Sequence, residues 1–337
     1  MSSTSELLPL TMDSSIDPQP RLNLGPTKAT PVRASQDSPA SGPSPSAHAR
    51  DRAISVVIPV RDAAHTLGEQ LEALAVAHRP DCGFEVIVSD NGSSDETAEI
   101  AVSFASRMTI RVVDAGGAPG SNYARNCGVR AARHQRILLC DGDDRVDADW
   151  LTAMSRGFDE GHQLMAGPID YVALNPAQVR AWRGADRAST GTILNFLGSG
   201  HGANLGFTKS LWNELNGFDE SFEFGGPDIE FCWRAQLRGT PLHTVPDAIV
   251  HYRLRPSLRK LYKQSRAYGA AEAHLYQKFA QFGLDRRPAS APIVDLWWIL
   301  TRLPFAVAQG RRGAWLRRLG QQIGRFEGSA RYRVLWW

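Results

Sequence analysis

The sequence predicts an α/β fold: a mostly parallel β-sheet with helices on both faces, followed by a helical C-terminal tail. Four short, β-branched apolar runs predict the strands, and amphipathic patterns with helical spacing lie between them. Strands that are apolar along their whole length need cover on both faces, which alternating helices supply. The 337 residues are 42% apolar and 22% charged, an ordinary globular balance that excludes a fibrous or wholly disordered chain.

Residues 1–50 are expected to be disordered. They contain eight Pro, ten Ser and no aromatic residue, so they cannot bury enough apolar surface to offset the entropy cost of ordering. They also lack the basic and apolar regions of a signal peptide. We therefore expect the first folded domain to cover residues 51–257. We also expect a cytoplasmic protein, because its four scattered cysteines fit a reducing compartment.

The elements of the first domain follow from local patterns. The predicted strands cover residues 54–58, 84–88, 110–113 and 136–140. Pro59 is expected to end the first strand. The spacing of Leu67, Leu71 and Leu74 predicts a helix after it, and a Ser93-x-x-Glu96 capping box predicts another after the second strand. Residues 150–250 are rich in glycine and less periodic, so we expect loops and short elements there.

Polar clusters follow the predicted strands at the edge where a parallel sheet binds its ligands. The strongest is Cys140-Asp141-Gly142-Asp143-Asp144. Carboxylates clustered at a strand end need a cation, and oxygen ligands suit Mg²⁺ or Mn²⁺, which often keep phosphate oxygens in their shell. A solvated acidic turn is the alternative. After the second strand, Asp90 suits a hydrogen bond from a base or ribose, although its surroundings also suit an Asx turn and helix cap.

Five ordered landmarks resemble those of the family-2 glycosyltransferases, which are inverting enzymes with the GT-A fold. They are Ser55–Asp62, Val88–Asp95, Ala124–Gly128, Asp141–Asp144, and Gly217–Glu220 together with Gly225–Arg234. The resemblance covers about residues 53–255. It implies a nucleotide-diphosphate sugar as donor, a divalent metal, and a hydroxyl of a glycan, lipid-linked or small-molecule acceptor.

The resemblance also implies roles for the matching residues. Asp228 would be the general base. Asp141, Asp143 and His251 would hold the metal, although a lone histidine after a strand often has only a structural part. Packing within a helix is the alternative role for Arg125 and Asn126, and a plain turn is the alternative for Asn204. The residues expected at the nucleotide sugar are Pro59, Val60, Arg61, Asp62, Asp90, Arg125, Asn126, Asp141, Gly142 and Asn204.

The sequence departs from the family pattern at three places. Pro227 stands where an acidic residue usually precedes the base, and Arg61 stands where an aromatic residue is common. The Q-x-x-R-W box of processive members is absent, because the chain reads Phe231-Cys232-Trp233-Arg234, so we expect transfer of single sugars. A nucleotidyltransferase is one alternative, but the turn after the first strand lacks the basic, glycine-rich loop it needs. A binding protein without catalysis is another, and the presence of all three acidic residues argues against it.

Residues 258–337 are expected to form a basic, Trp-rich helical extension. Residues 251–337 hold 17 Lys+Arg and 4 Asp+Glu. Interleaved Arg and Trp suit helices on an anionic membrane surface, so one interpretation is peripheral membrane contact through residues 290–337. Packing against the first domain or a dimer interface is the other. The charge also suits nucleic acid, but no known binding motif is present, so we expect no nucleic-acid partner.

Overall fold

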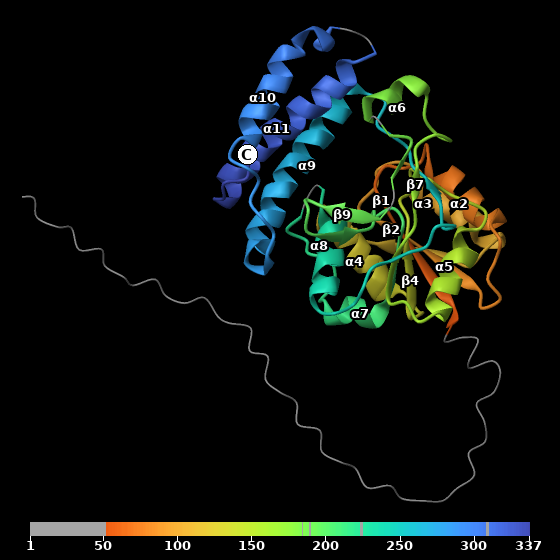
Figure 1. Ribbon diagram of the computed structural model, residues 1–337. Helices are drawn as coiled ribbons and strands as arrows, with labels where there is room; N and C mark the ends of the chain where they lie inside the picture. The colour runs from red at the N-terminus through yellow and green to blue at the C-terminus, as the bar shows by residue number, and fades with distance from the viewer. Residues whose placement is uncertain (1–51, 184, 189, 223–224, 308–309) are drawn as a thin grey trace, which may run out of the picture. The chain divides into compact units, whose positions relative to one another are not determined.

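The computed structural model describes residues 52–337, apart from residues 184, 189, 223–224 and 308–309 (Figure 1). The expected disorder of residues 1–50 lies outside the described residues. Within the described part, a seven-stranded sheet has the order β12-β6-β11-β4-β1-β2-β3. Its strands are β1 (Ile54–Val60), β2 (Phe84–Asp90), β3 (Ile110–Asp114), β4 (Arg136–Leu139), β6 (Leu164–Ala166), β11 (Leu205–Thr208) and β12 (His243–Thr244).

This sheet is mostly parallel, as predicted: β11 is antiparallel to β4 and β6, and the other pairs are parallel. Pro59 lies inside β1, so the prediction that it ends the strand is wrong. Val57 is the last β1 residue in register with β4, and its carbonyl accepts from Cys140 N–H. Pro59 directs its backbone to the same side, beyond the end of β4, so its missing N–H costs no ladder hydrogen bond.

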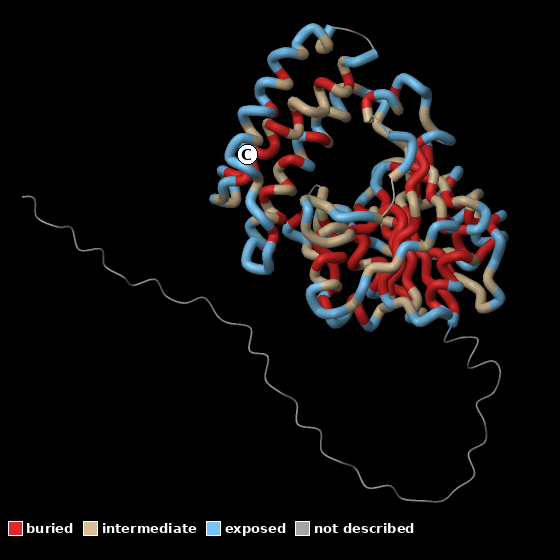
Figure 2. The backbone as a smooth tube through the Cα atoms, in the orientation of Figure 1, coloured by how far each residue is buried: buried red, intermediate tan, exposed pale blue. Residues whose placement is uncertain are grey.

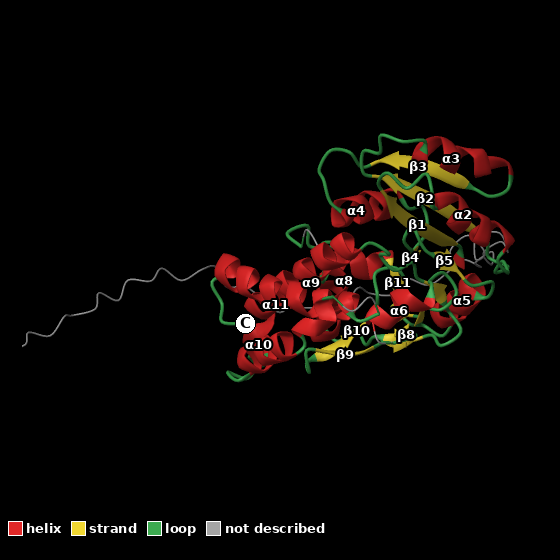
Figure 3. Ribbon diagram, turned by 90° about the horizontal axis from the view of Figure 1, so that it is seen from above, coloured by secondary structure: helices red, strands yellow, loops and turns green. Residues whose placement is uncertain are grey.

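Helices cover both faces of the sheet (Figures 1 and 3). One face carries α2 (Leu67–Val76), α3 (Thr97–Ser103) and α5 (Trp150–Asp159). The other carries α4 (Ser121–Ala131), α7 (Lys209–Glu214) and α8 (Pro227–Leu237). Strand β1 serves both layers, because Val56 and Ile58 join the first core while Val57 joins the second. Figure 2 shows the buried residues gathered on these central strands. The predicted α/β class is confirmed.

Short elements fill residues 150–250, as expected. A second sheet, in the order β5-β13-β7-β8, and a hairpin of β9 and β10 lie in the described part of this region and its flanks. The elements are β5 (Arg145–Val146), β7 (Ile169–Asp170), α6 (Ala177–Arg183), β8 (Arg187–Ala188), β9 (Gly191–Ile193), β10 (Leu197–Ser199) and β13 (Val250–His251). Because β5 directly follows the acidic turn, this second sheet begins at the edge where the sequence predicts the ligand site.

The described C-terminal part consists of α9 (Leu258–Phe279), α10 (Ala291–Thr301) and α11 (Arg312–Tyr332), with the 3₁₀ turns η2 (Ala280–Phe282) and η3 (Leu303–Ala306). A further 3₁₀ turn, η1 (Phe104–Ser106), follows α3. Helices α9 and α11 pack backbone to backbone because Gly320, Gly324 and Gly328 face α9. A Cβ at Gly324 would lie 1.8 Å from the Arg266 carbonyl oxygen, so only glycine fits there.

Helix α9 also packs on the first domain. The contact contains a buried apolar cluster of Phe222, Trp233, Leu275, Phe279 and Leu284. Beside it, the Lys278 ammonium lies 2.6 Å from Asp219 and also pairs with Glu230. Although burial opposes the change, the hydrogen bond from Lys278 lowers the pKa of Asp219 to about 2. These contacts support the packing interpretation for α9. In the part of the chain described, no helix is long and apolar enough to cross a membrane.

Candidate active site

The acidic turn after β4 brings three carboxylates together. One oxygen from each of Asp141, Asp143 and Asp144 lies within 4.8 Å of the others. The turn can approach β1 closely because a Cβ at Gly142 would lie 2.7 Å from Val60 Cγ1. Gly142 and Val60 are themselves buried. Converging carboxylate oxygens repel one another unless a cation balances them, and this donor set fits Mg²⁺ or Mn²⁺.

Asp144 is the member of this cluster to which the sequence analysis gave no role. Its side chain is buried, and its Oδ1 accepts from Arg253 N–H at 2.8 Å. Its Oδ2 has no hydrogen-bond partner among the described residues. Burial, and then the charges of Asp143 and Asp141, raise the pKa of this carboxyl well above its ordinary value. A buried oxygen without a partner beside two other carboxylates suits a metal ligand, and the D-x-D-D spacing was the signal for it.

Two arginines of the described chain pair with the acidic cluster. Arg125, from α4, places Nη2 3.3 Å from Asp141 Oδ1. Arg255 forms an ion pair with Asp143. The sequence pattern predicts Arg125 here but not Arg255, because nothing in the stretch after β13 marks an arginine that returns to the acidic turn. Each guanidinium satisfies one carboxylate and adds positive charge at this edge.

His251 lies outside the acidic cluster, so the structure does not bring it together with the other expected metal ligands. Its Nδ1 lies 2.8 Å from Asp170 Oδ2, and its Nε2 lies 3.4 Å from Asp147 Oδ2. Both ring nitrogens therefore face carboxylates other than those of the acidic turn. In the described chain, the side chains gathered closely enough to share a cation are three aspartates without a histidine. Within the acidic cluster, Asp144 rather than His251 lies beside Asp141 and Asp143.

Asp228 belongs to the same site, although it is far from the acidic turn in sequence. Its Oδ2 accepts from Gly202 N–H at 2.8 Å, and its Oδ1 accepts from Ile229 N–H at 3.0 Å. A Cβ at Gly202 would lie 3.2 Å from Arg125 Nη2 and 3.5 Å from Asp228 Cβ. The same Arg125 nitrogen contacts Asp141. Asp141, Arg125, Gly202 and Asp228 thus form one continuous set of contacts.

The start of α8 explains how Asp228 is placed. Gly225 and Gly226 have φ angles of +85° and +79°, in the left-handed region that favours glycine. Pro227 then opens the helix, where its missing N–H has no intrahelical partner to lose. The proline in the position expected to be acidic therefore serves as a helix start, and the next residue extends from the first turn. Two backbone N–H groups fix the Asp228 carboxylate.

His201 lies next to Gly202, whose N–H donates to Asp228. Desolvation lowers the pKa of His201 below its ordinary value, while the charges of Asp228 and Asp141 both oppose that change.

The turns after β1 and β2 are joined by hydrogen bonds. Asp62 Oδ1 accepts from Ser94 N–H at 2.8 Å, and Asp90 Oδ1 accepts from Ser93 N–H at 2.8 Å. The Asp90 side chain therefore closes the turn after β2 by binding the N–H three residues on, one residue beyond the Asx turn that was its alternative role. The Ser93 hydroxyl also donates to Asp90, and the N-cap of α3 has no side-chain hydrogen bond, so the capping-box prediction is wrong. Arg61 is exposed beside these turns, whereas Pro59 is half-buried inside β1.

Two residues expected at the nucleotide sugar, Asn204 and Asn126, form hydrogen bonds within the protein. Asn204 is fully buried; its Oδ1 accepts from Trp150 Nε1 at 2.8 Å, and its Nδ2 donates to the Pro168 carbonyl at 3.0 Å. Asn126 is also buried, and it donates to the Phe218 carbonyl and accepts from the Phe218 N–H, both at 2.9 Å. The amides of Asn204 and Asn126 thus hold neighbouring segments of the protein together.

Comparison with known proteins matches this architecture to glycosyltransferases. Residues 55–204 match the family model described as glycosyl transferase family 2, and residues 136–312 match glycosyl transferase family group 2. Glycosyltransferase AglE of Haloferax volcanii is 26% identical over 80% of this chain and 87% of its own length. The pre-mycofactocin glycosyltransferase of Mycobacterium tuberculosis is 27% identical over 70% of this chain, but the match spans only 49% of that relative.

Two solved structures share the fold. Staphylococcus aureus TarS has a TM-score of 0.50 and 19% identity over 81% of this chain and 55% of the TarS chain. The mannosyltransferase PcManGT of Pyrobaculum calidifontis, solved in complex with GDP-Man and Mn²⁺, has a TM-score of 0.50 and 19% identity. That match covers 82% of this chain and 75% of the mannosyltransferase chain. At these identities the likeness establishes the fold alone.

Proposed function

Since this chain belongs to glycosyltransferase family 2 and has the GT-A fold, we propose that it transfers one sugar from a nucleotide-diphosphate sugar to an acceptor hydroxyl. The transfer inverts the anomeric carbon and depends on a divalent cation. The observation that carries this proposal is the continuous contact from Asp141 through Arg125 and Gly202 to Asp228. These contacts support a leaving-group site and a base beside each other at one edge of the sheet.

Asp228 acts as the general base. It takes the proton of the acceptor hydroxyl while that oxygen attacks the anomeric carbon from the face opposite the diphosphate. The new carbon–oxygen bond forms as the bond to the diphosphate oxygen breaks. The N–H groups of Gly202 and Ile229 hold the carboxylate in place. A positioned base typically contributes about 10²–10⁴-fold to the rate.

The acidic turn is the proposed binding site for the cation that stabilises the diphosphate leaving group. Asp141, Asp143 and Asp144 would hold the cation, which when bound stabilises the negative charge that develops on the departing diphosphate. Arg125 and Arg255 orient two of these carboxylates. A diphosphate stabilised in this way departs without a proton, so the site needs one base rather than the acid and base pair of a glycosidase.

The paired turns after β1 and β2 are the proposed place for the nucleoside end of the donor. Arg61, Asp62 and Asp90 lie there, beyond the carboxyl ends of two adjacent parallel strands. This is the edge at which sheets of this kind bind nucleotides. The hydrogen bonds between the turns, from Asp62 N–H to Ser93 Oγ and from Ser94 N–H to Asp62 Oδ1, hold them in a fixed arrangement before a donor arrives.

The donor assignment predicts that nucleoside diphosphates raise the melting temperature of the full-length protein when Mn²⁺ is present. A ligand at 100 times its Kd adds about 2.7 kcal/mol to the free energy of unfolding. The measurement is a thermal-shift screen of uridine, thymidine and guanosine diphosphates, with the corresponding nucleosides as controls that lack the diphosphate. If no diphosphate shifts the melting temperature more than its nucleoside does, the donor assignment is wrong.

We also propose that α10 and η3 dock on an anionic membrane surface and bring the enzyme to a lipid-linked acceptor. Ile293, Trp297 and Leu300 are 69%, 63% and 69% exposed. Their spacing places them on one face of α10, and exposed Leu303 and Val307 continue the apolar surface. The excess of 17 Lys+Arg over 4 Asp+Glu in residues 251–337 complements an anionic surface.

The same observations narrow the membrane proposal for residues 290–337 to part of that range. Trp315 and Trp336 on or after α11 are buried, not exposed. Asp295, on the inner side of α10, is buried and pairs with Arg318 and Arg325 of α11. Trp315, Arg318 and Arg325 of α11 therefore pack internally, and α10 with η3 provides an outward apolar face.

Exchange of Trp297 and Leu300 together for Asp should abolish co-sedimentation with vesicles that contain anionic lipid, because charged side chains cannot enter the acyl boundary. Val102→Asp is the matched control, since Val102 is 61% exposed on α3, away from this face. We expect the control to sediment like the wild type. A wild-type protein that stays in the supernatant, or a double variant that still sediments, would contradict the proposal.

A further inference from the structure

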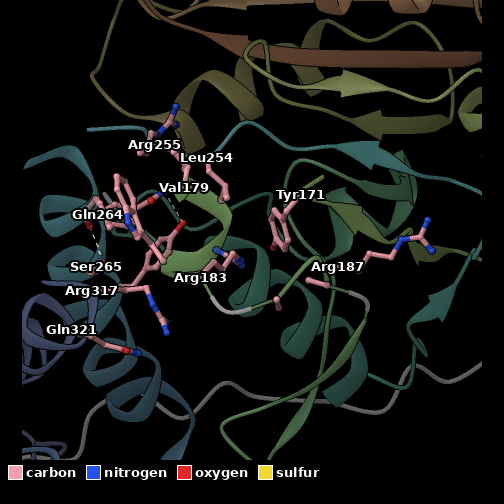
Figure 4. A pocket seen from close by; sticks show the side chains of 15 residues that line it. Tyr171, Val179, Arg183, Arg187, Leu254, Arg255, Gln264, Ser265, Arg317 and Gln321 are labelled. Carbon is pink, nitrogen blue, oxygen red and sulfur yellow. Dashed lines mark hydrogen bonds between the residues drawn. The ribbon is translucent and has the colours of Figure 1, made fainter. Parts of the chain in front are cut away.

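A cavity of about 320 Å³ lies between the first domain and the C-terminal helices (Figure 4). Helix α6 contributes Trp182 and Arg183, α9 contributes Tyr268, and α11 contributes Arg317. Of its described lining residues, four are arginine and none is acidic. We call this cavity the arginine pocket.

The arginine pocket contains positive charge without a matching carboxylate. Of its arginines, Arg255 pairs with Asp143, whereas Arg183 and Arg317 form no ion pair with any described residue. Arg183 lies over the Tyr171 ring, with its guanidinium carbon 4.2 Å from the ring centre. Figure 4 shows Arg183 and Arg317 on facing elements of the pocket wall. Two guanidinium groups that share a pocket repel each other unless an anion joins them.

Two buried N–H donors in the same wall also lack partners. The Trp182 side chain is 6% exposed, and its Nε1 has no acceptor among the described residues. Arg317 Nε is buried and has no acceptor there either. Burial, and then the charge of Arg183, lower the pKa of Arg317 from its ordinary value. Because buried donors are normally satisfied, this combination of donors and charge indicates a site for an anion.

The arginine pocket borders the proposed active site. Tyr268 lines the pocket and packs on Gly225, where a Cβ would lie 2.6 Å from Tyr268 Cδ1. Gly225 is in the loop that leads directly to Asp228. Arg255 is a second link, because its side chain lines the pocket and its guanidinium pairs with Asp143. An acceptor anchored in the pocket is therefore close to the base.

We propose that the arginine pocket binds a phosphate group of the acceptor, so that the enzyme glycosylates an acceptor that carries phosphate. The inference rests on the glycosyl transfer proposed above and names its acceptor class. A phosphate has enough oxygens to accept from Arg183, Arg317 and Trp182 together, whereas a carboxylate has two. The diphosphate of the donor has its own place at the acidic turn, so it does not compete for this pocket.

The test compares two acceptors that differ only in a phosphate: a methyl glycoside and its phosphate monoester. The wild type should use the phosphorylated acceptor with a kcat/KM at least about tenfold higher, as expected for charge-assisted hydrogen bonds. Arg183→Gln and Arg317→Gln should each lose most of that preference. Hydrolysis of the donor without acceptor should stay unchanged in both variants, which also shows that they are folded. A wild type without preference, or variants that keep it, would overturn the proposal.

The matched control is Arg259→Gln, because Arg259 is an exposed arginine of α9 that does not line the pocket. It should keep the wild-type preference. If all donor turnover is absent, the proposed function fails, and a binding measurement still tests the pocket. Glycerol phosphate in solution, and the same phosphate displayed by phosphatidic acid vesicles, should each be compared with the wild type and Arg317→Gln.

The two binding arms distinguish the source of the phosphate. Binding of free glycerol phosphate that is lost in Arg317→Gln supports a soluble acceptor, and Arg317-dependent binding to vesicles alone supports a lipid-borne one. Binding that is insensitive to Arg317 in both arms, or no binding in either, would overturn the pocket assignment even if donor turnover is observed.

Discussion

Asp228→Asn should lower kcat by about two orders of magnitude or more, while the affinity for the donor stays near its wild-type value. An amide has nearly the same shape as the carboxylate, and its oxygen can still accept from Gly202 N–H. It cannot take the proton of an acceptor hydroxyl at neutral pH. The loss should therefore appear in the chemical step, as measured by steady-state kinetics with saturating donor and by calorimetry for donor binding.

Asp247→Asn is a suitable control for this substitution. Asp247 is exposed, and its carboxylate lies 3.6 Å from Arg156 on the surface, so loss of its charge should leave kcat unchanged. The Asp228 variant should also keep the melting temperature of the wild type. A near-normal kcat in Asp228→Asn would remove this residue from the role of base.

The second large effect concerns the acidic turn. Asp143→Ala should abolish the dependence of donor binding on Mn²⁺, because it removes one of three converging carboxylates. In the wild type, a chelator should weaken donor binding by at least about tenfold, which corresponds to the loss of a strong electrostatic contact. In the variant, calorimetry with and without chelator should give the same affinity.

The variant His251→Gln tests which metal-ligand set is right: the set with His251 that the sequence predicts, or the three aspartates of the acidic turn. Since His251 pairs with Asp170 and Asp147 rather than with the acidic turn, this variant should keep the Mn²⁺ dependence of the wild type. Asp144→Asn should behave like Asp143→Ala. Loss of the Mn²⁺ response in His251→Gln, together with its retention in Asp144→Asn, would show that the sequence expectation was right and the revised ligand set wrong.

Much of the first domain could be predicted because it depends on local patterns. Continuous apolar runs identified the four parallel strands, and their ends marked the edge where Asp141, Asp90 and Arg61 lie. The direction in which a side-chain amide points depends on long-range packing, so a local sequence pattern does not predict it. Asn204 and Asn126 fit a ligand-binding pattern in sequence, but only the packed structure shows that their polar atoms bond to Trp150 and to the Phe218 backbone.

Long-range contacts explain the remaining differences. Arg255 reaches Asp143 only because β13 lies beside β5, a pairing that no short motif encodes. In the tail, basic and aromatic residues are interleaved throughout, so composition could not separate the outward face of α10 from the inward face of α11. The spacing of Gly320, Gly324 and Gly328 was the available signal, since close packing of α11 on α9 depends on it.

The central claim is that a metal-bound diphosphate and the Asp228 carboxylate meet at one edge of the sheet. A crystal structure with Mn²⁺ and a nucleoside diphosphate, with the metal located by its anomalous scattering, tests this most directly. We expect a metal peak roughly 2.0–2.3 Å from oxygens of the Asp141, Asp143 and Asp144 group and of the diphosphate, with Asp228 beside the diphosphate. A metal between His251 and Asp170, or a nucleotide bound away from this edge, would contradict it.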